Sequence, residues 1–140
     1  MRTKIIFLLL FVVSCSLPIY PPNKVEIYTP QDEKGNFFFE VGQESKIDPL
    51  DIVIYIDDEK ILDGKYYNSR EGAHFINFDE YLFNLEEGDH TIKAESKLGN
   101  ANIETAFQVD NKTYAFLVYR DFKDTPQFIF NYQTEPFYRD

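Results

Sequence analysis

Hydrophobic and polar residues alternate with a period of two along most of the chain beyond its N-terminal segment. The alternation is clearest in four stretches, 24–28 ("KVEIY"), 36–42 ("NFFFEVG"), 85–96 ("LEEGDHTIKAES") and 101–109 ("ANIETAFQV"). Successive side chains of a β-strand point to opposite faces of a sheet, so this period predicts strands with one buried face. No stretch of ten or more residues has a strong period of 3.6. The pattern therefore predicts an all-β fold.

Two further stretches, 51–57 ("DIVIYID") and 113–119 ("TYAFLVY"), are apolar on both faces. For 51–57 this pattern predicts a central strand, which the turn "DDEK" joins to a returning strand as a hairpin. We also expect strands at 61–65, 73–78, 80–85 and 127–132. For 80–85, a strand and a turn of helix both remain open. Strands that recur every 8 to 15 residues or so, with turn residues between them, predict an antiparallel β-sandwich.

Residues 85–109 form the clearest predicted hairpin, with His90 and Ile92 on one face of its first strand. The segment resembles the last hairpin of bacterial immunoglobulin-like modules, with Leu-x-x-Gly-x-His/Tyr, an alternating strand, a small-residue turn and a second alternating strand. The resemblance implies an immunoglobulin-like β-sandwich with its core in 24–110 and extra strands in 111–140. In immunoglobulin domains a tyrosine near the start of this strand fixes the corner, and a cysteine follows two residues later. His90 has the tyrosine-like place and Ile92 the cysteine-like place, so the resemblance implies a corner role for His90 and no disulfide.

The N-terminal segment predicts export. Arg2 and Lys4 precede an unbroken apolar run from Ile5 to Val13. A transmembrane helix needs about 20 apolar residues, whereas this shorter run has the length of the apolar core of a secretory signal. The sequence therefore predicts a signal peptide in residues 1–14.

The cleavage region "VVSC" (12–15) resembles the lipobox of bacterial lipoproteins. The resemblance implies that residues 1–14 are removed and that diacylglycerol is attached to the thiol of Cys15, the only cysteine of the chain. Two or three acyl chains hold a protein firmly on a membrane, because each buried methylene contributes about 0.8 kcal/mol. Ser16 is compatible with sorting to the outer membrane, while the periplasmic and surface faces both remain open. An ordinary signal peptide with an incidental cysteine is the alternative.

Residues 15–23 are predicted to form a tether between the lipid and the domain. Pro18, Pro21 and Pro22 disfavour helix and favour an extended, semi-rigid chain. After the signal peptide, the expected organisation is the lipid-bearing tether followed by a β-sandwich domain in 24–140.

The amino-acid composition also favours β-strands, and the net charge indicates which kinds of partner the domain can have. The chain has 14 Phe and 10 Tyr but no Trp, and aromatic residues are enriched in strands. Its formal net charge is −10, and removal of residues 1–14 with the cations Arg2 and Lys4 leaves −12. Such a domain is expected to repel nucleic acid and anionic lipid headgroups, and its charged partners should be cationic, although the charge can also serve solubility alone.

No catalytic or metal-binding motif is evident. His74 and His90 fall on different predicted strands, and neither has further ligands at the spacing of a metal site. Paired acids catalyse glycoside hydrolysis only when a cleft holds them about 5 to 9 Å apart. The acids of this chain lie in predicted turns, where they are ordinary solvated residues: Asp57, Asp58, Glu59, Asp63, Asp79, Glu80, Glu86, Glu87 and Asp89. The sequence therefore predicts no catalytic residue, no metal ligand and no cofactor.

Two aromatic pairs outside the clear strands are candidate partner-binding residues, Tyr66 with Tyr67 and Phe137 with Tyr138. Tyrosine has an apolar ring face and a polar hydroxyl, so it can stack on a pyranose ring or contact a protein surface. Packing within the domain or against the tether is the alternative.

The sequence favours a membrane-anchored lipoprotein of the cell envelope that acts as a non-catalytic binding or structural module for a protein or glycan partner. The alternative is an acidic lipoprotein of the inhibitor or immunity type, which neutralises a basic toxin or hydrolase, since opposite charge speeds encounter. An enzyme is the third and most distant hypothesis. The fold class alone is a weak guide among them.

Overall fold

The computed structural model describes residues 21–68 and 78–138. Cys15, His74 and most of the predicted strand 73–78 lie outside the described residues. Over the described ranges, the all-β fold class predicted from the alternation is confirmed.

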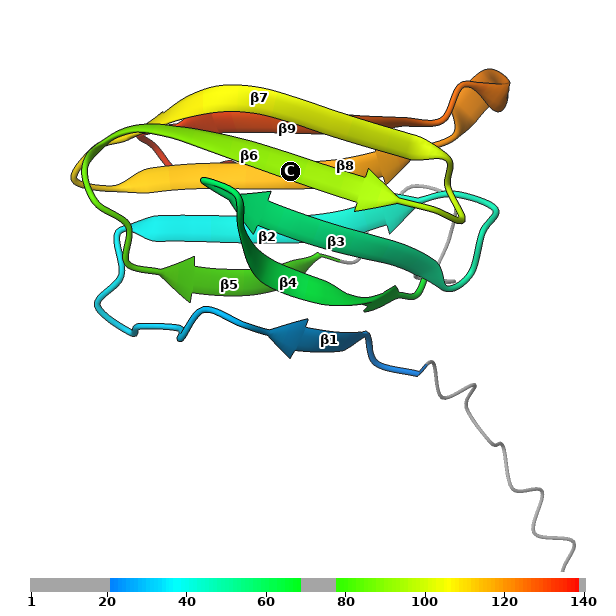
Figure 1. The fold of residues 1–140 in the computed structure, drawn as a ribbon, viewed down its shortest axis with the longest axis horizontal. Helices are drawn as coiled ribbons and strands as arrows, with labels where there is room; N and C mark the ends of the chain where they lie inside the picture. Colours follow the sequence, from blue (N-terminus) through cyan, green and yellow to red (C-terminus); the bar gives the residue numbers. More distant parts are fainter. Residues whose placement is uncertain (1–20, 69–77, 139–140) are drawn as a thin grey trace, which may run out of the picture.

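The strands form two sheets that pack face to face as a sandwich (Figure 1). The first sheet is antiparallel, with strands in the order β1 (Lys24–Ile27), β4 (Glu59–Tyr66), β3 (Leu50–Ile56), β6 (Gly88–Ser96) and β7 (Ala101–Val109). The second sheet has strands in the order β5 (Asp79–Phe83), β2 (Phe37–Glu44), β8 (Thr113–Arg120) and β9 (Gln127–Gln133). A short 3₁₀ turn, η1 (Phe122–Asp124), lies between β8 and β9.

The alternating stretches become strands as predicted. β2 buries Phe37, Phe39 and Val41 and turns the residues between them outward. β3 is the central strand of its sheet, as its two apolar faces predict, and the stretch 113–119 becomes β8, which lies between β2 and β9. The stretch 80–85, which the pattern left open, contains strand β5.

One pairing differs from the predicted antiparallel arrangement. β2 and β8 run parallel, in register from Phe37 opposite Thr113 to Glu44 opposite Arg120, so the second sheet is mixed. A half-buried strand has the same period of two whether its neighbour runs parallel or antiparallel to it. The direction of two strands far apart in the sequence is therefore decided by the chain path between them.

The core lies between the two sheets, and β8 supplies part of it. Leu117 and Tyr119 of β8 are buried in the same cluster as the inward side chains of β2, β3 and β6. Across the sandwich, the ring of Phe107 lies 5.4 Å from that of Phe37. Residues 111–140 thus contribute to one core together with residues 24–110.

We call one end of the sandwich the tether end, because the first described residues lie there together with the β2–β3 loop, the β6–β7 turn and η1 (Figure 1). Asn23 Oδ1 accepts a hydrogen bond of 2.6 Å from Tyr67 N, which fixes the start of the domain beside the end of β4. Tyr119 Oη donates to Gly99 O at 2.9 Å and ties the β6–β7 turn to β8. Glycine is required at this position, because a Cβ on Gly99 would lie 2.6 Å from the Tyr119 ring.

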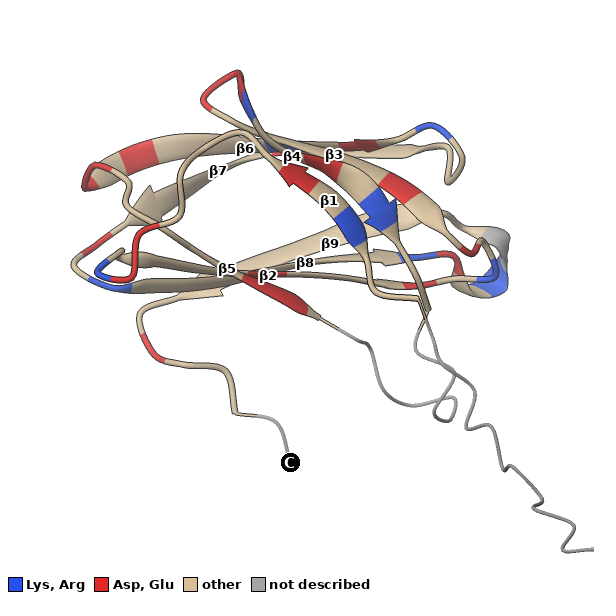
Figure 2. Ribbon diagram, turned by 90° about the horizontal axis from the view of Figure 1, so that it is seen from below, with Lys and Arg blue, Asp and Glu red and all other residues tan. Residues whose placement is uncertain are grey.

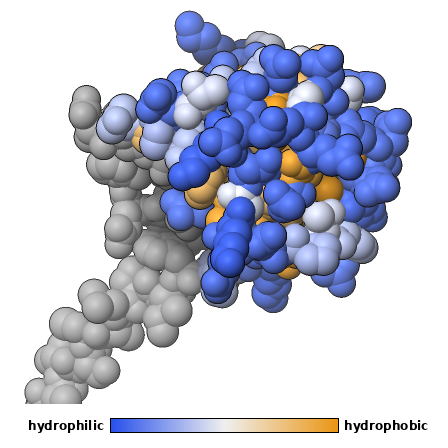
Figure 3. Space-filling view, turned by 90° about the vertical axis from the view of Figure 1, so that its left-hand side faces the viewer, coloured by the Kyte–Doolittle hydropathy of each residue, from blue (hydrophilic) through white to orange (hydrophobic). Residues whose placement is uncertain are grey.

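The opposite end, which we call the far end, holds loop 28–36 and the connections β3–β4, β5–β6 and β7–β8 (Figure 1). Acidic residues gather in these connections, as Figure 2 shows. They are Asp32, Glu33, Asp57, Asp58, Glu86, Glu87 and Asp110. Seen from this side, hydrophilic residues cover most of the surface (Figure 3).

Replacing Leu117 by alanine should lower the free energy of unfolding by about 2 to 5 kcal/mol, because it leaves a cavity among buried side chains of both sheets. Leu98→Ala is the matched control, since Leu98 is 61% exposed in the β6–β7 turn and its loss should cost less than about 0.5 kcal/mol. Urea unfolding followed by circular dichroism measures both values. A loss below about 1 kcal/mol for Leu117→Ala would show that β8 is not part of the core.

Candidate functional site

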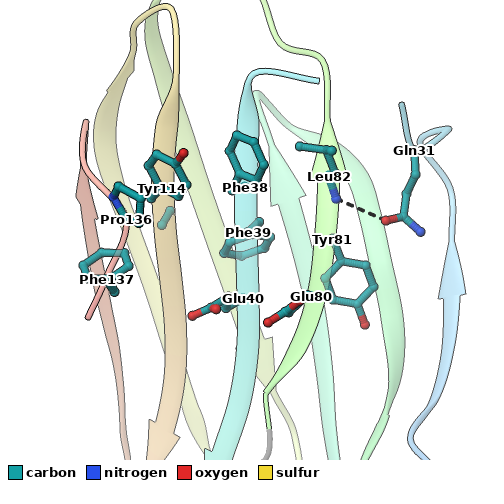
Figure 4. A pocket seen from close by; sticks show the side chains of 11 residues that line it. Gln31, Phe38, Phe39, Glu40, Glu80, Tyr81, Leu82, Tyr114, Pro136 and Phe137 are labelled. Atoms are coloured by element: carbon teal, nitrogen blue, oxygen red, sulfur yellow. Dashed lines mark hydrogen bonds between the residues drawn. The ribbon is translucent and has the colours of Figure 1, made fainter. Parts of the chain in front are cut away.

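An open groove crosses the outer face of the second sheet, over β5, β2 and β8 (Figure 4). Its volume is about 450 Å³, within the usual range of ligand pockets. The residues that line it are Gln31, Phe38, Phe39, Glu40, Glu80, Tyr81, Leu82, Tyr114, Ala115, Pro136 and Phe137. Its lining combines aromatic side chains with a few polar groups, as binding sites usually do, and it is therefore the candidate functional site.

Aromatic side chains form the floor of the groove. Phe38 and Tyr114 are the outward residues of two neighbouring strands and lie opposite each other in the parallel register of β2 and β8. Their rings stack with centroids 4.6 Å apart and an angle of 12° between the planes. Both side chains are half-buried, so part of each ring remains accessible from the groove.

Two segments outside the sheet form the walls. On one side, the chain after β9 folds back so that Phe137 packs edge-on against Phe116, with centroids 4.9 Å apart. Gln133 Nε2 donates to Glu135 O at 2.8 Å and stabilises this return. On the other side, Gln31 Oε1 accepts a hydrogen bond of 3.1 Å from Leu82 N, which covers the edge of β5 (Figure 4).

Two carboxylates lie at one end of the groove, and the stacked rings lie toward the other (Figure 4). Glu40 of β2 is directly opposite Glu80 of β5 in the antiparallel register, which places their Cβ atoms about 5 Å apart. The sequence placed Asp79 and Glu80 in a turn, but they begin strand β5. Aromatic faces attract cations, and carboxylates accept hydrogen bonds from ammonium or guanidinium groups. The groove therefore has the chemistry to hold a cationic side chain.

The structure separates the four aromatic residues that the sequence singled out. Phe137 lines the groove, and Tyr138 beside it is 88% exposed. Tyr67 is half-buried and follows β4 of the first sheet at the tether end. The two predicted pairs therefore do not share a surface.

The prediction that Tyr66 contacts a partner is wrong, because its side chain is 0% exposed. The sequence suggested a loop, but β4 continues to Tyr66 and its alternation turns that ring inward. Its Oη lies 3.1 Å from Tyr81 Oη, which in turn donates to Asp79 Oδ2 at 3.2 Å. Burial raises the pKa of both tyrosines above the ordinary value, and the nearby charge of Asp79 acts in the same direction. Both hydroxyls thus stay protonated and link the two sheets.

Sequence reasoning missed most of the groove. Phe38 lies in the run "FFF", where its outward direction follows from the alternation, and Tyr114 lies in a strand that is apolar on both faces. Outward aromatic side chains on an inner strand of the sheet were the available signal, because such residues need a cover. Nothing in the sequence indicated that β5 brings Glu80 next to Glu40.

At the far end, His90 joins two loops to the start of β6. Its Nδ1 lies 2.6 Å from Asp57 Oδ2, and its Nε2 lies 2.6 Å from Glu86 O. Both partners are acceptors, so both ring nitrogens donate only when the imidazole is protonated. Burial by itself lowers the pKa of His90, but the hydrogen bonds to Glu86 and Asp57 outweigh it and raise the pKa above its ordinary value.

Within residues 21–68 and 78–138, no helix is long and apolar enough to cross a membrane. In the same ranges, no group of three or more His, Cys, Asp or Glu side chains is placed to hold a metal ion. No protein-family model matches the chain, and no curated protein and no solved structure is significantly similar to it.

Stability should depend on pH through His90 and Asp57. Because the pKa of His90 is raised in the folded state, its contribution is complete below the unfolded value of about 6.5 and is lost as the pH rises through the higher folded value. Burial raises the pKa of Asp57, but hydrogen bonds from Thr91 and His90 outweigh it and lower the pKa. That contribution is present above the unfolded value of about 3.9 and is lost as the pH falls through the lower folded value.

We therefore expect the free energy of unfolding, measured in urea at a series of pH values, to decrease as the pH rises above about 6.5. His90→Asn should remove this decrease. The variant retains His74, the other histidine of the chain, so the difference between the two proteins isolates His90. An unchanged pH dependence in His90→Asn would contradict the assigned role of His90.

Proposed function

We propose that this chain is a lipid-anchored lipoprotein of the bacterial cell envelope, in which the sandwich is a non-catalytic module that binds a protein partner. The anchor is supported by the motif "VVSC" (12–15) after an apolar run of signal-peptide length. It is also supported by the occurrence of the only cysteine at Cys15, followed by a proline-containing tether. Acylation of that thiol leaves the mature chain without a free cysteine.

The groove carries the binding part of the proposal. The observation that favours a protein partner is the stacked pair Phe38–Tyr114 in one open site with the carboxylates of Glu40 and Glu80. A lysine or arginine side chain can lie over the rings while its charged group reaches a carboxylate. The net charge of −12 after removal of residues 1–14 draws a cationic partner toward the domain.

The same groove favours binding over catalysis. Opposite positions in a sheet make the side chains of two acids neighbours, and retaining glycosidases likewise use two neighbouring carboxyl groups. Those enzymes keep one carboxyl protonated by burying it, whereas Glu80 is exposed on an open face of the sheet. A site of this kind can present negative charge to a cationic partner.

An immunoglobulin-like topology is part of the same proposal. The order β3–β6–β7 matches the order C–F–G of immunoglobulin domains, and the pair β2–β5 matches B–E. The contact from His90 to Glu86 O, four residues upstream, resembles the backbone contact of a tyrosine corner. β8 lies beside β2 on the side where strand A lies in those domains, although it runs parallel to β2.

The charge distribution favours a second function, that of an acidic lipoprotein that neutralises a basic toxin or hydrolase. Acidic residues crowd the far end (Figure 2), where opposite charge would speed encounter with a basic protein. The two functions use different surfaces. Glu86→Gln combined with Glu87→Gln would weaken capture by the far end and leave groove binding unchanged.

Mass spectrometry of the native protein should find a chain that begins at Cys15 and carries two or three acyl groups. A Cys15→Ser variant should leave the membrane fraction or keep residues 1–14, because the site of acylation is gone. An unmodified thiol in the native protein, or residues 1–14 still attached to it, would overturn the anchor.

A photo-crosslinking amino acid in place of Tyr114 should capture a partner protein in intact cells. The same amino acid in place of Tyr55, which lies on the outer face of the first sheet, is the control and should capture none. Adding Glu80→Gln should lower the yield at position 114 at least about threefold, because it removes a carboxylate from the cationic group. Glu104→Gln, an exposed substitution on β7, should leave the yield unchanged. Equal capture from positions 114 and 55 would refute groove binding, and capture of glycan alone would reassign the partner.

A further inference from the structure

The position of the first described residues decides which end of the domain an N-terminal lipid holds near the bilayer. Seven residues lie between Cys15 and Asn23, and the eight Cα–Cα steps from one to the other span at most about 29 Å. Asn23 is fixed at the tether end by its hydrogen bond with Tyr67 N. The far end is separated from the tether end by the length of the strands. Strand β6, with its nine residues, is about 30 Å long. A lipid on Cys15 therefore joins the chain at the tether end, and any shorter, less extended path of residues 16–22 brings that end nearest the membrane.

The loops of the tether end present two large apolar side chains to solvent. Leu98 in the β6–β7 turn is 61% exposed, and Phe122 in η1 is 56% exposed. Both turns are held in place, the first by the bond from Tyr119 Oη to Gly99 O and the second by the bond from Lys46 N to Asp121 Oδ2. Although the domain as a whole is strongly acidic, these two apolar side chains at one end of it can insert at the boundary between lipid headgroups and acyl chains.

Exposed lysines accompany these two side chains. Lys97 precedes Leu98, Lys123 follows Phe122, and Lys46 lies in the neighbouring β2–β3 loop; all three lysines are exposed. A cleft of about 370 Å³ lies between the β2–β3 loop and η1, and its lining includes Lys46, Phe122 and Lys123. Cations beside an apolar tip provide the contacts that an anionic lipid headgroup needs.

The acids of this end are engaged with the protein itself. Asp51 accepts hydrogen bonds from Ser96 Oγ and from the backbone amides of Lys97 and Leu98. Asp121 accepts from Lys46 N at 3.1 Å.

Two further acids of this end also have partners within the protein. Asp48 accepts a hydrogen bond from Asn68 N, and Glu44 lies 3.1 Å from Arg120 Nε. Asp124, the remaining acid of these loops, directly follows Lys123. Lys46, Lys97 and Lys123 are exposed beside the two apolar side chains and supply the cationic groups of the tether end.

Along the β1–β4 pair, positive charge lies at the tether end and negative charge lies closer to the far end. Lys24 lies opposite Lys65 at the tether end, and Glu26 lies opposite Asp63 two pairs further toward the far end. Like charges directly opposite each other in a sheet are unfavourable. An anionic surface next to the tether end would relieve the repulsion between the two lysines.

From these observations we propose that the tether end is a membrane-contact surface that fits anionic phospholipid. Leu98 and Phe122 enter the headgroup layer, and the adjacent lysines contact the phosphates. The acidic far end is repelled by the same surface and points away from it. The proposal rests on the lipid anchor proposed above and adds a fixed orientation of the domain, in which the far end points away from the membrane and the groove stays open at the side.

The chain contains no tryptophan, so a single introduced tryptophan reports its own position. We would reconstitute the acylated full protein in vesicles of phosphatidylglycerol and phosphatidylcholine in equal parts, carrying a lipid quencher in the acyl chains. Phe122→Trp should show blue-shifted emission and quenching. Asn111→Trp, exposed in the β7–β8 turn at the far end, is the control and should show neither.

Charge is tested by two double variants of equal net charge in the Phe122→Trp background. Lys97→Glu with Lys123→Glu should lower the quenching at least about threefold, since each lysine near an anionic surface contributes to contact. Lys34→Glu with Lys112→Glu, at the far end, should leave it unchanged. In vesicles of phosphatidylcholine alone, the quenching of Phe122→Trp should be lowered to the same extent, because the anionic lipid is absent.

Sedimentation of the vesicles separates the two hypotheses. Protein that sediments with the vesicles but is not quenched at position 122 retains its anchor and refutes the contact surface. Equal quenching at positions 122 and 111 also refutes the fixed orientation. Protein that fails to sediment refutes the anchor, and the contact surface with it.

Discussion

The parallel pairing of β8 with β2 is the constraint on which the rest of the structure depends. The inward side chains of β8, Leu117 among them, complete the core between the sheets. Its outward residue Tyr114 stacks on Phe38 and forms the groove floor. At the end of the same strand, Tyr119 holds the β6–β7 turn through Gly99 O. One strand near the C-terminus therefore connects the core, the candidate site and the tether end.

The two proposals together give the domain a direction. Asn23 fixes the start of the sandwich beside the end of β4, and the acidic loops lie at the opposite end (Figure 2). The groove runs on the side of the second sheet, so a domain standing on its tether end would leave both the groove and the far end open to partners. Anchor, charge and site would then act together, since an anionic lipid surface attracts one end and repels the other.

How much of the candidate site follows from the sequence can be judged from individual residues. Phe137 was singled out and lines the groove, because it lies outside the strands and is free to fold back over the sheet. Tyr66 was singled out by the same reasoning and is buried, because β4 is longer than its pattern indicated. Glu40 and Glu80 became neighbours only when β2 and β5, far apart in the chain, paired in one register.

The sequence by itself determined the all-β class, the position of most strands and the inward face of each, because alternation is a local property of the chain. Only the tertiary structure decided which strands are neighbours, that β8 runs parallel to β2, and that acidic loops from four connections gather at one end. Strand order and direction arise from packing between segments distant in sequence, and a period of two is the same for every neighbour and either direction. For that reason the groove, which three strands form together, exists only in the folded chain.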